Sequence, residues 1–259
     1  MEAQSNLLEK KKPWGLNQTQ LKFIAILSML VDHLVYGIFE VGLYQNIISA
    51  SNITIGGSYV TSAMMEKLEF FGRIVIGRIA FPLFCFFIVQ GFMHTRNRMK
   101  YALRLLIFAF ISEVPFDLVS SNTVFDPNYQ NVFFTLFLGL AALIIIEKFA
   151  NQPLIRIIGT IACIFAAKYL RTDYDMFGVM LIILMYFVRF NKFQNLMVGM
   201  STRYFYGFYY QMTAFALMYL YNGERGKGLK YFFYAFYPVH LLLIYFLRMY
   251  IASSPIAIF

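Results

Sequence analysis

The stretch SMLVDHLVYG, residues 28–37, decides how the whole chain is interpreted. It places Asp32 and His33 side by side within residues 21–39, a run that is otherwise almost wholly apolar. The meaning of an acid beside an imidazole in such a run depends on the surrounding solvent, because a lipid interior makes both side chains costly. The solvent is therefore the first thing to establish.

The composition indicates that this solvent is a lipid bilayer. Of the 259 residues, 60% are hydrophobic and 14% are charged, whereas soluble domains average roughly 45–50% apolar and about 25% charged residues. A soluble fold would need a core for all of these apolar side chains, but a bilayer accepts them on the outer surface too. The chain is therefore predicted to be a membrane protein.

The net charge of +9 does not indicate a nucleic-acid partner. Nucleic-acid binding needs basic residues gathered on one exposed face, whereas here they lie in short loops between apolar runs, the pattern of a multi-pass membrane protein. Cys85 and Cys163 both lie within apolar runs, so neither a disulfide nor a metal site is expected. The lipid bilayer is the expected partner of the basic loops.

The predicted fold class is all-α, a polytopic transmembrane helix bundle with eight or nine spans and a cytoplasmic N-terminus. A basic tail (1–17) precedes a single transmembrane domain (18–252), and a short tail (253–259) follows it. The spans are expected at about 18–39, 70–94, 100–119, 132–150, 154–170, 175–190 and 231–252, with one or two more within 193–221.

The orientation follows from the distribution of lysine and arginine. Residues 10–12 are three lysines before the first span, which predicts a cytoplasmic N-terminus. The loop at 94–100 is then inside and is basic, whereas the loop at 120–131 is outside and has no lysine or arginine. The basic loop at 222–230 favours two crossings within 193–221.

Several charged side chains are predicted to lie at one depth inside the membrane. At about 1.5 Å per helical residue, His33 lies roughly 22 Å from the inner boundary and Arg78 about 12 Å below the outer one. Glu113 and Asp117 are four residues apart, so they share a helix face. The side chains expected at this depth in the outer half are Asp32, His33, Arg78, Glu113, Asp117, Asp173 and Asp175.

An ionisable side chain in lipid costs about 2.5–3.5 kcal/mol, so these groups should face one another or a wet cavity. The three acids of the first and third spans are predicted to pair with Arg78, with His33 among them. A carboxylate beside an imidazole fixes its tautomer and raises its basicity, which is typical of a general base. Two alternatives stay open: Arg78 and Glu113 form a structural lock, and the mid-membrane His240 only hydrogen-bonds a neighbouring helix.

The glycine-rich loop NGERGKG, residues 222–228, has two interpretations. Its glycines and basic residues resemble a phosphate cradle, but it matches no nucleotide-binding pattern and does not lie between a strand and a helix. The alternative is a flexible loop whose charges set the topology.

Seven blocks of the sequence, taken in order, resemble those of the TraX family of membrane proteins. They run from near the beginning of the chain to near its end. The blocks are LKFIAILSMLVDH (21–33), GRIAFPLFCFFIVQGFMHT (77–95), RLLIFAFISEVPFDL (104–118), NVFFTL (131–136), DYDMFG (173–178), YNGERG (221–226) and FYPVHL (236–241). One departure is Asp175, where the family pattern has a glycine that would serve a tight turn.

The resemblance implies an acyltransferase of a bacterial plasma membrane that uses acetyl-CoA as its co-substrate and needs no metal. Carried over from the matching blocks, the catalytic residues would be His33, Asp32, Arg78, Glu113, Asp117 and His240. The substrate-binding residues would be Asn131, Asp173 and Tyr174.

The resemblance and the predicted charge cluster together give a mechanism. Basic residues of the inner loops are expected to hold the phosphates of acetyl-CoA, and His33 to take a proton from the acceptor as it attacks the thioester. Arg78 or His240 would steady the oxyanion. The acyl acceptor, approaching from outside, is an exported protein N-terminus, a glycan or a lipid-linked precursor. The phosphate-binding residues are expected to be Arg96, Arg98, Lys100, Arg225 and Lys227.

Two other functions use the same features. An exporter of a small polar solute would bind its cargo or relay protons with the buried charges, but the internal repeat typical of that class is not visible in the sequence. A non-catalytic assembly factor would tolerate neutralisation of the charges in pairs.

Overall fold

The computed structural model describes residues 14–206 and 211–258, so residues 1–13 of the predicted basic tail lie outside the described part. The described chain is mostly helical. Three helical stretches are long and apolar enough to cross a membrane: Gln18–Tyr44, Ser62–His94 and Tyr231–Ser253. The helical fold and the membrane character are therefore confirmed, while the number of spans and their orientation stay predictions.

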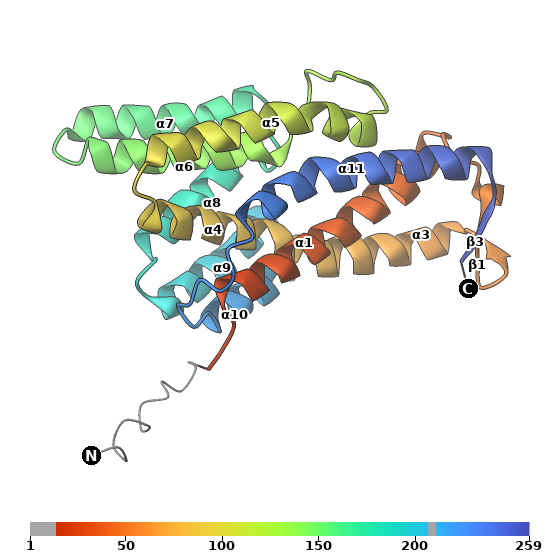
Figure 1. The fold of residues 1–259 in the computed structure, drawn as a ribbon, viewed down its shortest axis with the longest axis horizontal. Helices are drawn as coiled ribbons and strands as arrows, with labels where there is room; N and C mark the ends of the chain where they lie inside the picture. Colours follow the sequence, from red (N-terminus) through yellow and green to blue (C-terminus); the bar gives the residue numbers. More distant parts are fainter. Residues whose placement is uncertain (1–13, 207–210, 259) are drawn as a thin grey trace, which may run out of the picture.

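Helices occur at each position where the hydrophobic runs predict one (Figure 1). The α-helices are α1 (Gln18–Leu34), α2 (Val41–Tyr44), α3 (Ser62–Leu68), α4 (Ala80–His94), α5 (Arg98–Ser120), α6 (Val132–Lys148), α7 (Pro153–Tyr169), α8 (Asp175–Phe187), α9 (Lys192–Tyr206), α10 (Met212–Tyr219) and α11 (Lys230–Ser253). Shorter helical turns are the π-helices η1 (Val35–Glu40) and η3 (Glu69–Ile76) and the 3-10 helices η2 (Ala50–Asn52) and η4 (Gly77–Ile79).

The segment at 193–221 holds two short helices, α9 with 15 residues and α10 with 8. At about 1.5 Å per residue they are roughly 22 Å and 12 Å long, whereas the hydrocarbon core is about 30 Å thick. Neither helix alone is long enough to cross. Residues 207–210 between them lie outside the described part, so the number of crossings here stays a prediction.

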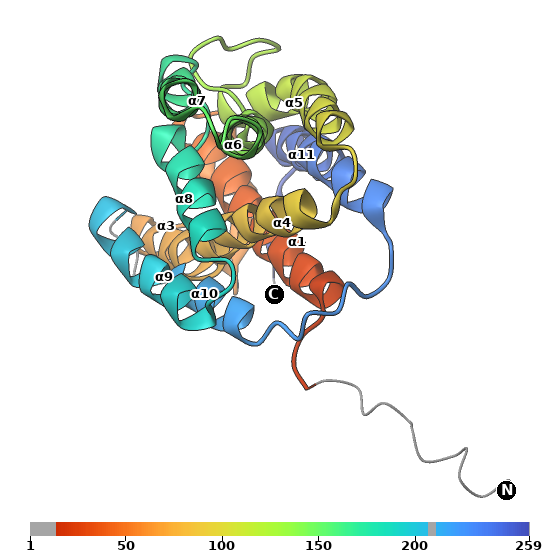
Figure 2. The ribbon, with the colours of Figure 1, turned by 90° about the vertical axis from the view of Figure 1, so that its left-hand side faces the viewer.

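The helices from the two ends of the chain, α1 and α11, run side by side along the long axis of the molecule (Figures 1 and 2). The α5 helix packs along α11, and α6 packs against α5, α7 and α8. The α4 helix crosses α1 and also contacts α8 and α6. This arrangement brings the histidine-containing faces of the first and last helices together in the centre of the bundle.

A small sheet closes the end of the bundle at which α11 terminates (Figure 1). Its strands are β1 (Ile53–Ile55), β2 (Ser58–Tyr59) and β3 (Ile256–Ile258), in the order β2-β1-β3. The short tail predicted at 253–259 contributes strand β3, in which Ile256 pairs with Ile53 in a parallel ladder. Three residues are too few to show an alternating pattern, and the pairing joins distant parts of the chain, so sequence periodicity does not reveal it.

Arg248 locks the last helix to two others although it has no described carboxylate partner. Its side chain is fully buried. The guanidinium donates to the carbonyl oxygens of Val119 at 2.8 Å, Gly37 at 3.3 Å and Leu118, and to Asn122 Oδ1 at 3.1 Å. These carbonyls belong to the end of α5 and to η1. One buried arginine thus satisfies carbonyl oxygens that the end of α5 leaves free, and it also donates to a carbonyl oxygen of η1.

Replacing Arg248 with methionine should destabilise the protein by about 2–4 kcal/mol, because several buried carbonyl groups lose their donor. Thermal melting in detergent should show a Tm roughly 5–10 °C lower. Arg156→Met is a matched control, since Arg156 makes one 3.4 Å bond, to the Ala150 carbonyl, at the beginning of α7. Equal Tm values for the two variants would contradict the role of Arg248 in holding the last helix to α5 and η1.

Candidate active site

His33 and His240 form a hydrogen-bonded pair that joins α1 to α11. His33 Nδ1 lies 2.7 Å from His240 Nε2. The rings stack with centroids 5.0 Å apart and an interplanar angle of 11°. His240 is only 3% exposed, whereas His33 is half-buried. The more accessible ring is therefore the one on α1.

A carbonyl oxygen on α11 fixes which nitrogen of each neutral ring carries hydrogen. His240 Nδ1 lies 2.7 Å from the carbonyl oxygen of Phe236, and a carbonyl only accepts, so Nδ1–H donates to it. The Nε2 atom of His240 then carries a lone pair and accepts from Nδ1–H of His33. The Nε2 atom of His33 is consequently left with a lone pair, as a general base requires.

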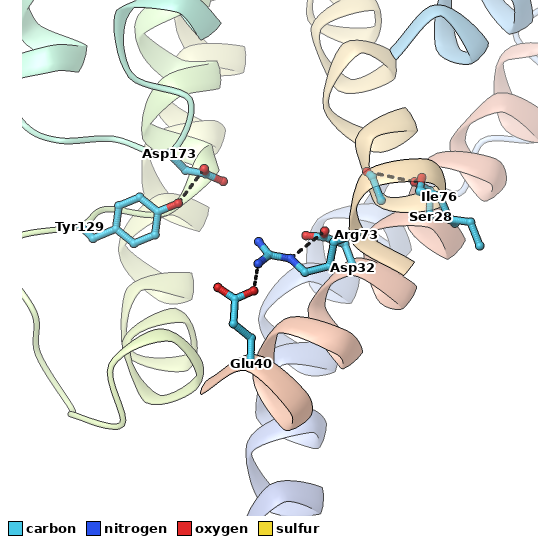
Figure 3. A network of polar contacts seen from close by, with 8 residues as sticks. Ser28, Asp32, Glu40, Arg73, Ile76, Tyr129 and Asp173 are labelled. Atoms are coloured by element: carbon cyan, nitrogen blue, oxygen red, sulfur yellow. Dashed lines mark hydrogen bonds and ion pairs between the residues drawn. The ribbon is translucent and has the colours of Figure 1, made fainter. Parts of the chain in front are cut away.

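Asp32 pairs with Arg73 on the adjacent helical stretch (Figure 3), whereas its neighbour His33 pairs with His240. Arg73 Nε lies 3.4 Å from Asp32 Oδ1, and the same guanidinium is hydrogen-bonded to Glu40. It also lies over the ring of Tyr36 at 4.6 Å. The Asp32 and Arg73 side chains are 19% and 21% exposed and Glu40 is 33% exposed, so this group is only partly buried.

A close helix crossing holds Asp32 in place. A Cβ atom added at Gly77 would lie 2.5 Å from Asp32 Oδ1 and 2.7 Å from Asp32 Cβ, so only a glycine fits. One turn earlier, Ser28 Oγ donates to the carbonyl oxygen of Ile76 at 2.6 Å (Figure 3). The backbone of η3 and η4 therefore lies directly against the polar face of α1.

A second set of polar residues comes from the loops around α6 and α8. Tyr129 donates its hydroxyl to Asp173 Oδ1 at 2.9 Å (Figure 3). Arg78 hydrogen-bonds Tyr174 and lies within electrostatic range of both Asp32 and Asp173. We call these residues together the polar cluster: Asp32, Glu40, Arg73, Arg78, Tyr129, Asp173 and Tyr174.

Asp173 lies in the loop between α7 and α8. Burial raises the pKa of its carboxyl group to about 6, and the hydrogen bond from Tyr129 acts in the opposite direction. A carboxyl group with such a pKa exists in both protonation states near neutral pH. Together with its place in the polar cluster, this marks Asp173 as a candidate functional group.

The other predicted acids lie elsewhere. Glu113 accepts hydrogen bonds from the Asn131 side chain and backbone N–H, whereas Arg78, its predicted partner, is hydrogen-bonded to Tyr174. Asn131 itself is fully buried, caps α6 by accepting from the Phe133 backbone N–H at 3.0 Å, and so has a structural role. Asp117, also buried, accepts from the backbone N–H of Asp126 at 2.9 Å at the end of α5.

The departure from the family pattern at Asp175 falls on a backbone position that favours glycine. Asp175 has a φ of +48°, and the preceding Tyr174 has a φ of +65°. Both lie in the left-handed region, which glycine adopts without the steric cost that a side chain brings. The tight turn that the family glycine implies is therefore present here. It places the ring of Tyr174 flat against Phe81, with centroids 3.5 Å apart.

A cavity of about 490 Å³ leads from the N-terminal end of α1 towards the histidine pair. Lys22, Arg104 and Arg225 line it, as do many aromatic rings. Its inner end includes Met29, four residues before His33 on the same helix, and Tyr237. The Tyr237 ring lies edge-on to His33 at 5.9 Å and to His240 at 5.6 Å. The Tyr237 ring thus lies between the inner end of the cavity and the two histidines.

Only one of the five predicted phosphate-binding residues, Arg225, lines this cavity. Arg98 instead pairs with Glu147 at 2.9 Å and lies 4.1 Å from the centre of the Phe92 ring. The other three, which are exposed and do not contribute to the cavity wall, are Arg96, Lys100 and Lys227. Lys22 and Arg104 are not predicted as phosphate-binding residues because they lie within apolar runs, whereas such residues are expected in the basic loops.

Three further residues near the histidine pair are not predicted from the sequence: Glu40, Arg73 and Tyr237. The helix containing Arg73 begins at Ser62, not near residue 70, so Arg73 lies well inside it. Thr61 was the available signal, because its side chain caps this helix by accepting from the Met64 backbone N–H. No sequence pattern marks η1 and η3, the π-helices that contain Glu40 and Arg73.

The fold and the site define a helical membrane protein in which a basic cavity ends beside a buried histidine pair. The chain belongs to the TraX family: it matches the family described as TraX protein over residues 17–248. It is 32% identical over 253 residues to "Probable fimbrial assembly protein FimC, serogroup H1" of Dichelobacter nodosus. That match covers 87% of this chain and 93% of the relative. No solved structure matches the chain.

Replacing Gly77 with alanine should displace Asp32 and weaken its pair with Arg73, because the new methyl group overlaps the carboxylate. Overpacking of this kind costs about 1–3 kcal/mol, so thermal melting should occur at a lower temperature than in the wild type. Gly228→Ala is the control, since a Cβ there meets no atom within 4 Å. An unchanged Tm for the Gly77 variant would show that the close crossing is not as tight as described.

Proposed function

We propose that this protein is a membrane-embedded acyltransferase. It transfers an acetyl group from acetyl-CoA to an amine or hydroxyl group of an exported or surface acceptor, with His33 as the general base. The observation that carries the proposal is the position of His33. This half-buried base, with its tautomer fixed by His240, lies between the end of the basic cavity and the polar cluster.

The proposed topology is a bundle of eight or nine spans in a bacterial plasma membrane, with a cytoplasmic N-terminus. The cavity then opens at the cytoplasmic side, because Gln18, Lys22 and Arg225 lie at its mouth. Acetyl-CoA is made in the cytoplasm, and its phosphates do not enter lipid cheaply. The polar cluster lies nearer the opposite end of α1 and receives the acceptor from outside.

In the proposed mechanism the acetyl thioester reaches His33 past Tyr237. The tyrosine ring stands between the cavity and both histidines, and its side chain is only 3% exposed. Its hydroxyl group donates a hydrogen bond to the thioester carbonyl oxygen as negative charge develops there. A donor fixed in a water-excluded site stabilises such charge strongly.

The chemical step is a nucleophilic acyl substitution. The acceptor nitrogen or oxygen forms a bond to the carbonyl carbon, and its proton moves to Nε2 of His33. The carbon–sulfur bond then breaks, and the proton passes from His33 to the sulfur, releasing CoA as a thiol. His240 stabilises the protonated His33 ring by accepting from its Nδ1–H, so it acts as a positioning residue.

The polar cluster is the proposed acceptor site. Arg73 and Arg78 are held by carboxylate and tyrosine partners that keep the guanidinium groups next to α1. Asp173 and Tyr174 come from the loop on the other side of the site, as the family resemblance implies for substrate contact. The relative's name refers to fimbrial assembly, which favours an exported surface protein among the possible acceptors.

Replacing His33 with alanine should abolish acetyl transfer, because the proposed reaction needs Nε2 of His33 to take the acceptor's proton. Mass spectrometry of exported proteins and surface polymers should show a species that loses about 42 Da, the mass of one acetyl addition, in cells carrying this variant. The rise in Tm that CoA causes should stay near that of the wild type.

Transfer that continued in the His33 variant would reject the assignment. A melting experiment distinguishes the proposed enzyme from the two other functions. Acetyl-CoA and CoA should raise the Tm of the wild-type protein. An exporter of another solute, or a non-catalytic assembly factor, would show no such shift.

Replacing Tyr237 with phenylalanine removes only the hydroxyl group and should lower kcat by about 100-fold, the usual effect of losing one oxyanion donor. The KM for acetyl-CoA should change little, because the ring stays in the cavity wall. Tyr169→Phe, at an 88% exposed position, is the matched control. An unchanged kcat for the Tyr237 variant would exclude the hydroxyl group from the reaction.

A further inference from the structure

We propose that Lys22, Arg104 and Arg225 form a phosphate-binding site in the wall of the cavity. The site would take the nucleotide end of the acyl donor, and this inference rests on the proposed function. Three cations line one cavity, and none of the described residues on its wall is an aspartate or glutamate. An unneutralised positive wall of this kind selects an anion.

None of the three cations belongs to an ion pair within residues 14–206 and 211–258. Arg104 is hydrogen-bonded to the hydroxyl group of Tyr234, which is neutral. Lys22 and Arg225 repel each other across the mouth of the cavity. Like charges held together without a described counterion are costly, and a bound phosphate would remove that cost.

The backbone of the glycine-rich loop is built to hold Arg225 next to Lys22. Thr19 Oγ1 donates to the carbonyl oxygens of Lys227 at 2.8 Å and Arg225 at 3.1 Å. Gly226 has a φ of +70°, and a Cβ there would lie 2.7 Å from Thr19 Oγ1. The loop is therefore fixed on α1, which favours the cradle over the flexible-loop interpretation.

Aromatic rings complete the site. The ammonium group of Lys22 lies 5.6 Å from the centre of the Phe87 ring and 5.4 Å from that of Phe233, so cation–π contacts hold it in the cavity. Tyr101 and Tyr221 line the same wall, and a nucleobase stacks on aromatic rings of this kind. A phosphate group joined to an aromatic base therefore matches the wall better than a simple anion does.

This site distinguishes two kinds of acyl donor. A CoA thioester carries a nucleotide with several phosphates, which fits the cations and rings together. A carrier-protein thioester carries the same pantetheine arm without the nucleotide, and its protein part would have to lie at the cavity mouth. The structure thus favours the free CoA thioester as the donor.

The test is binding of adenosine 3′,5′-bisphosphate, which is the nucleotide end of CoA without the arm, to purified full-length protein. Wild-type protein should bind it, and Lys22→Met and Arg225→Gln should each weaken binding by about tenfold, the effect of one lost charge-assisted contact. Pantetheine binding should not change. The controls Lys148→Met and Arg156→Gln remove charges from side chains that do not line the cavity.

Bisphosphate that fails to bind the wild type, or that binds all variants equally, would overturn the proposal, even if acetyl transfer from acetyl-CoA were found. Bisphosphate that binds as expected without any acetyl transfer would uphold the site and reject the proposed enzyme. Acetyl-acyl carrier protein serves as a second donor: transfer from it at the rate seen with acetyl-CoA would also contradict the proposal. If a variant failed to fold, loss of wild-type binding with rising salt would serve in its place.

Discussion

The hydrogen bond between His33 and His240 is the contact on which the rest of the site depends. It joins the first long helix to the last, so the tautomer of His33 is fixed only when α1 and α11 have packed together. The carbonyl oxygen of Phe236 sets the tautomer of His240, and His240 in turn sets that of His33. A backbone group on α11 thereby determines which atom of α1 is free to accept a proton.

Buried charged groups elsewhere in the fold also depend on partners from other helices. Lipid cannot solvate an ionic or polar group, so each must find a partner within the protein. Arg73 finds two carboxylates, whereas Arg248 finds only backbone carbonyls and an amide. The cavity cations are different, because the wall around them provides no described acid. This difference between the partnered arginines and the cavity cations is what supports the proposed phosphate ligand.

The sequence predicts the helices, the membrane character and the family well, because long apolar runs and ordered motif blocks carry that information directly. It also predicts that Asp32, His33, Arg78 and Asp173 approach one another, since their depth follows from position along each helix. The partners are another matter. Adjacent helical residues point about 100° apart, so His33 turns to His240 while Asp32 turns to Arg73. The sequence therefore predicts how deep a side chain lies in the membrane, but not the direction in which it points around the helix axis.

Other features depend on contacts between distant parts of the chain or on local backbone geometry. The strand at 256–258 exists only because it pairs with β1, and the π-helices that hold Glu40 and Arg73 shift the register without a sequence signal. The position of Arg98 in a basic loop predicts a phosphate ligand, but in the structure Arg98 forms an ion pair with Glu147. In the sequence Lys22 only flanks the first span, but the loop at 222–228 is hydrogen-bonded to Thr19 on the same helix, and Arg225 of this loop lines one cavity with Lys22.

The central claim is that one path leads from the basic mouth of the cavity to His33. A cryo-electron microscopy structure of the protein with CoA bound tests it most directly. The nucleotide should lie against Lys22 and Arg225, and the sulfur atom should lie beside Tyr237 within reach of Nε2 of His33. Density for CoA in another place, or a thiol end directed away from the histidine pair, would contradict the account.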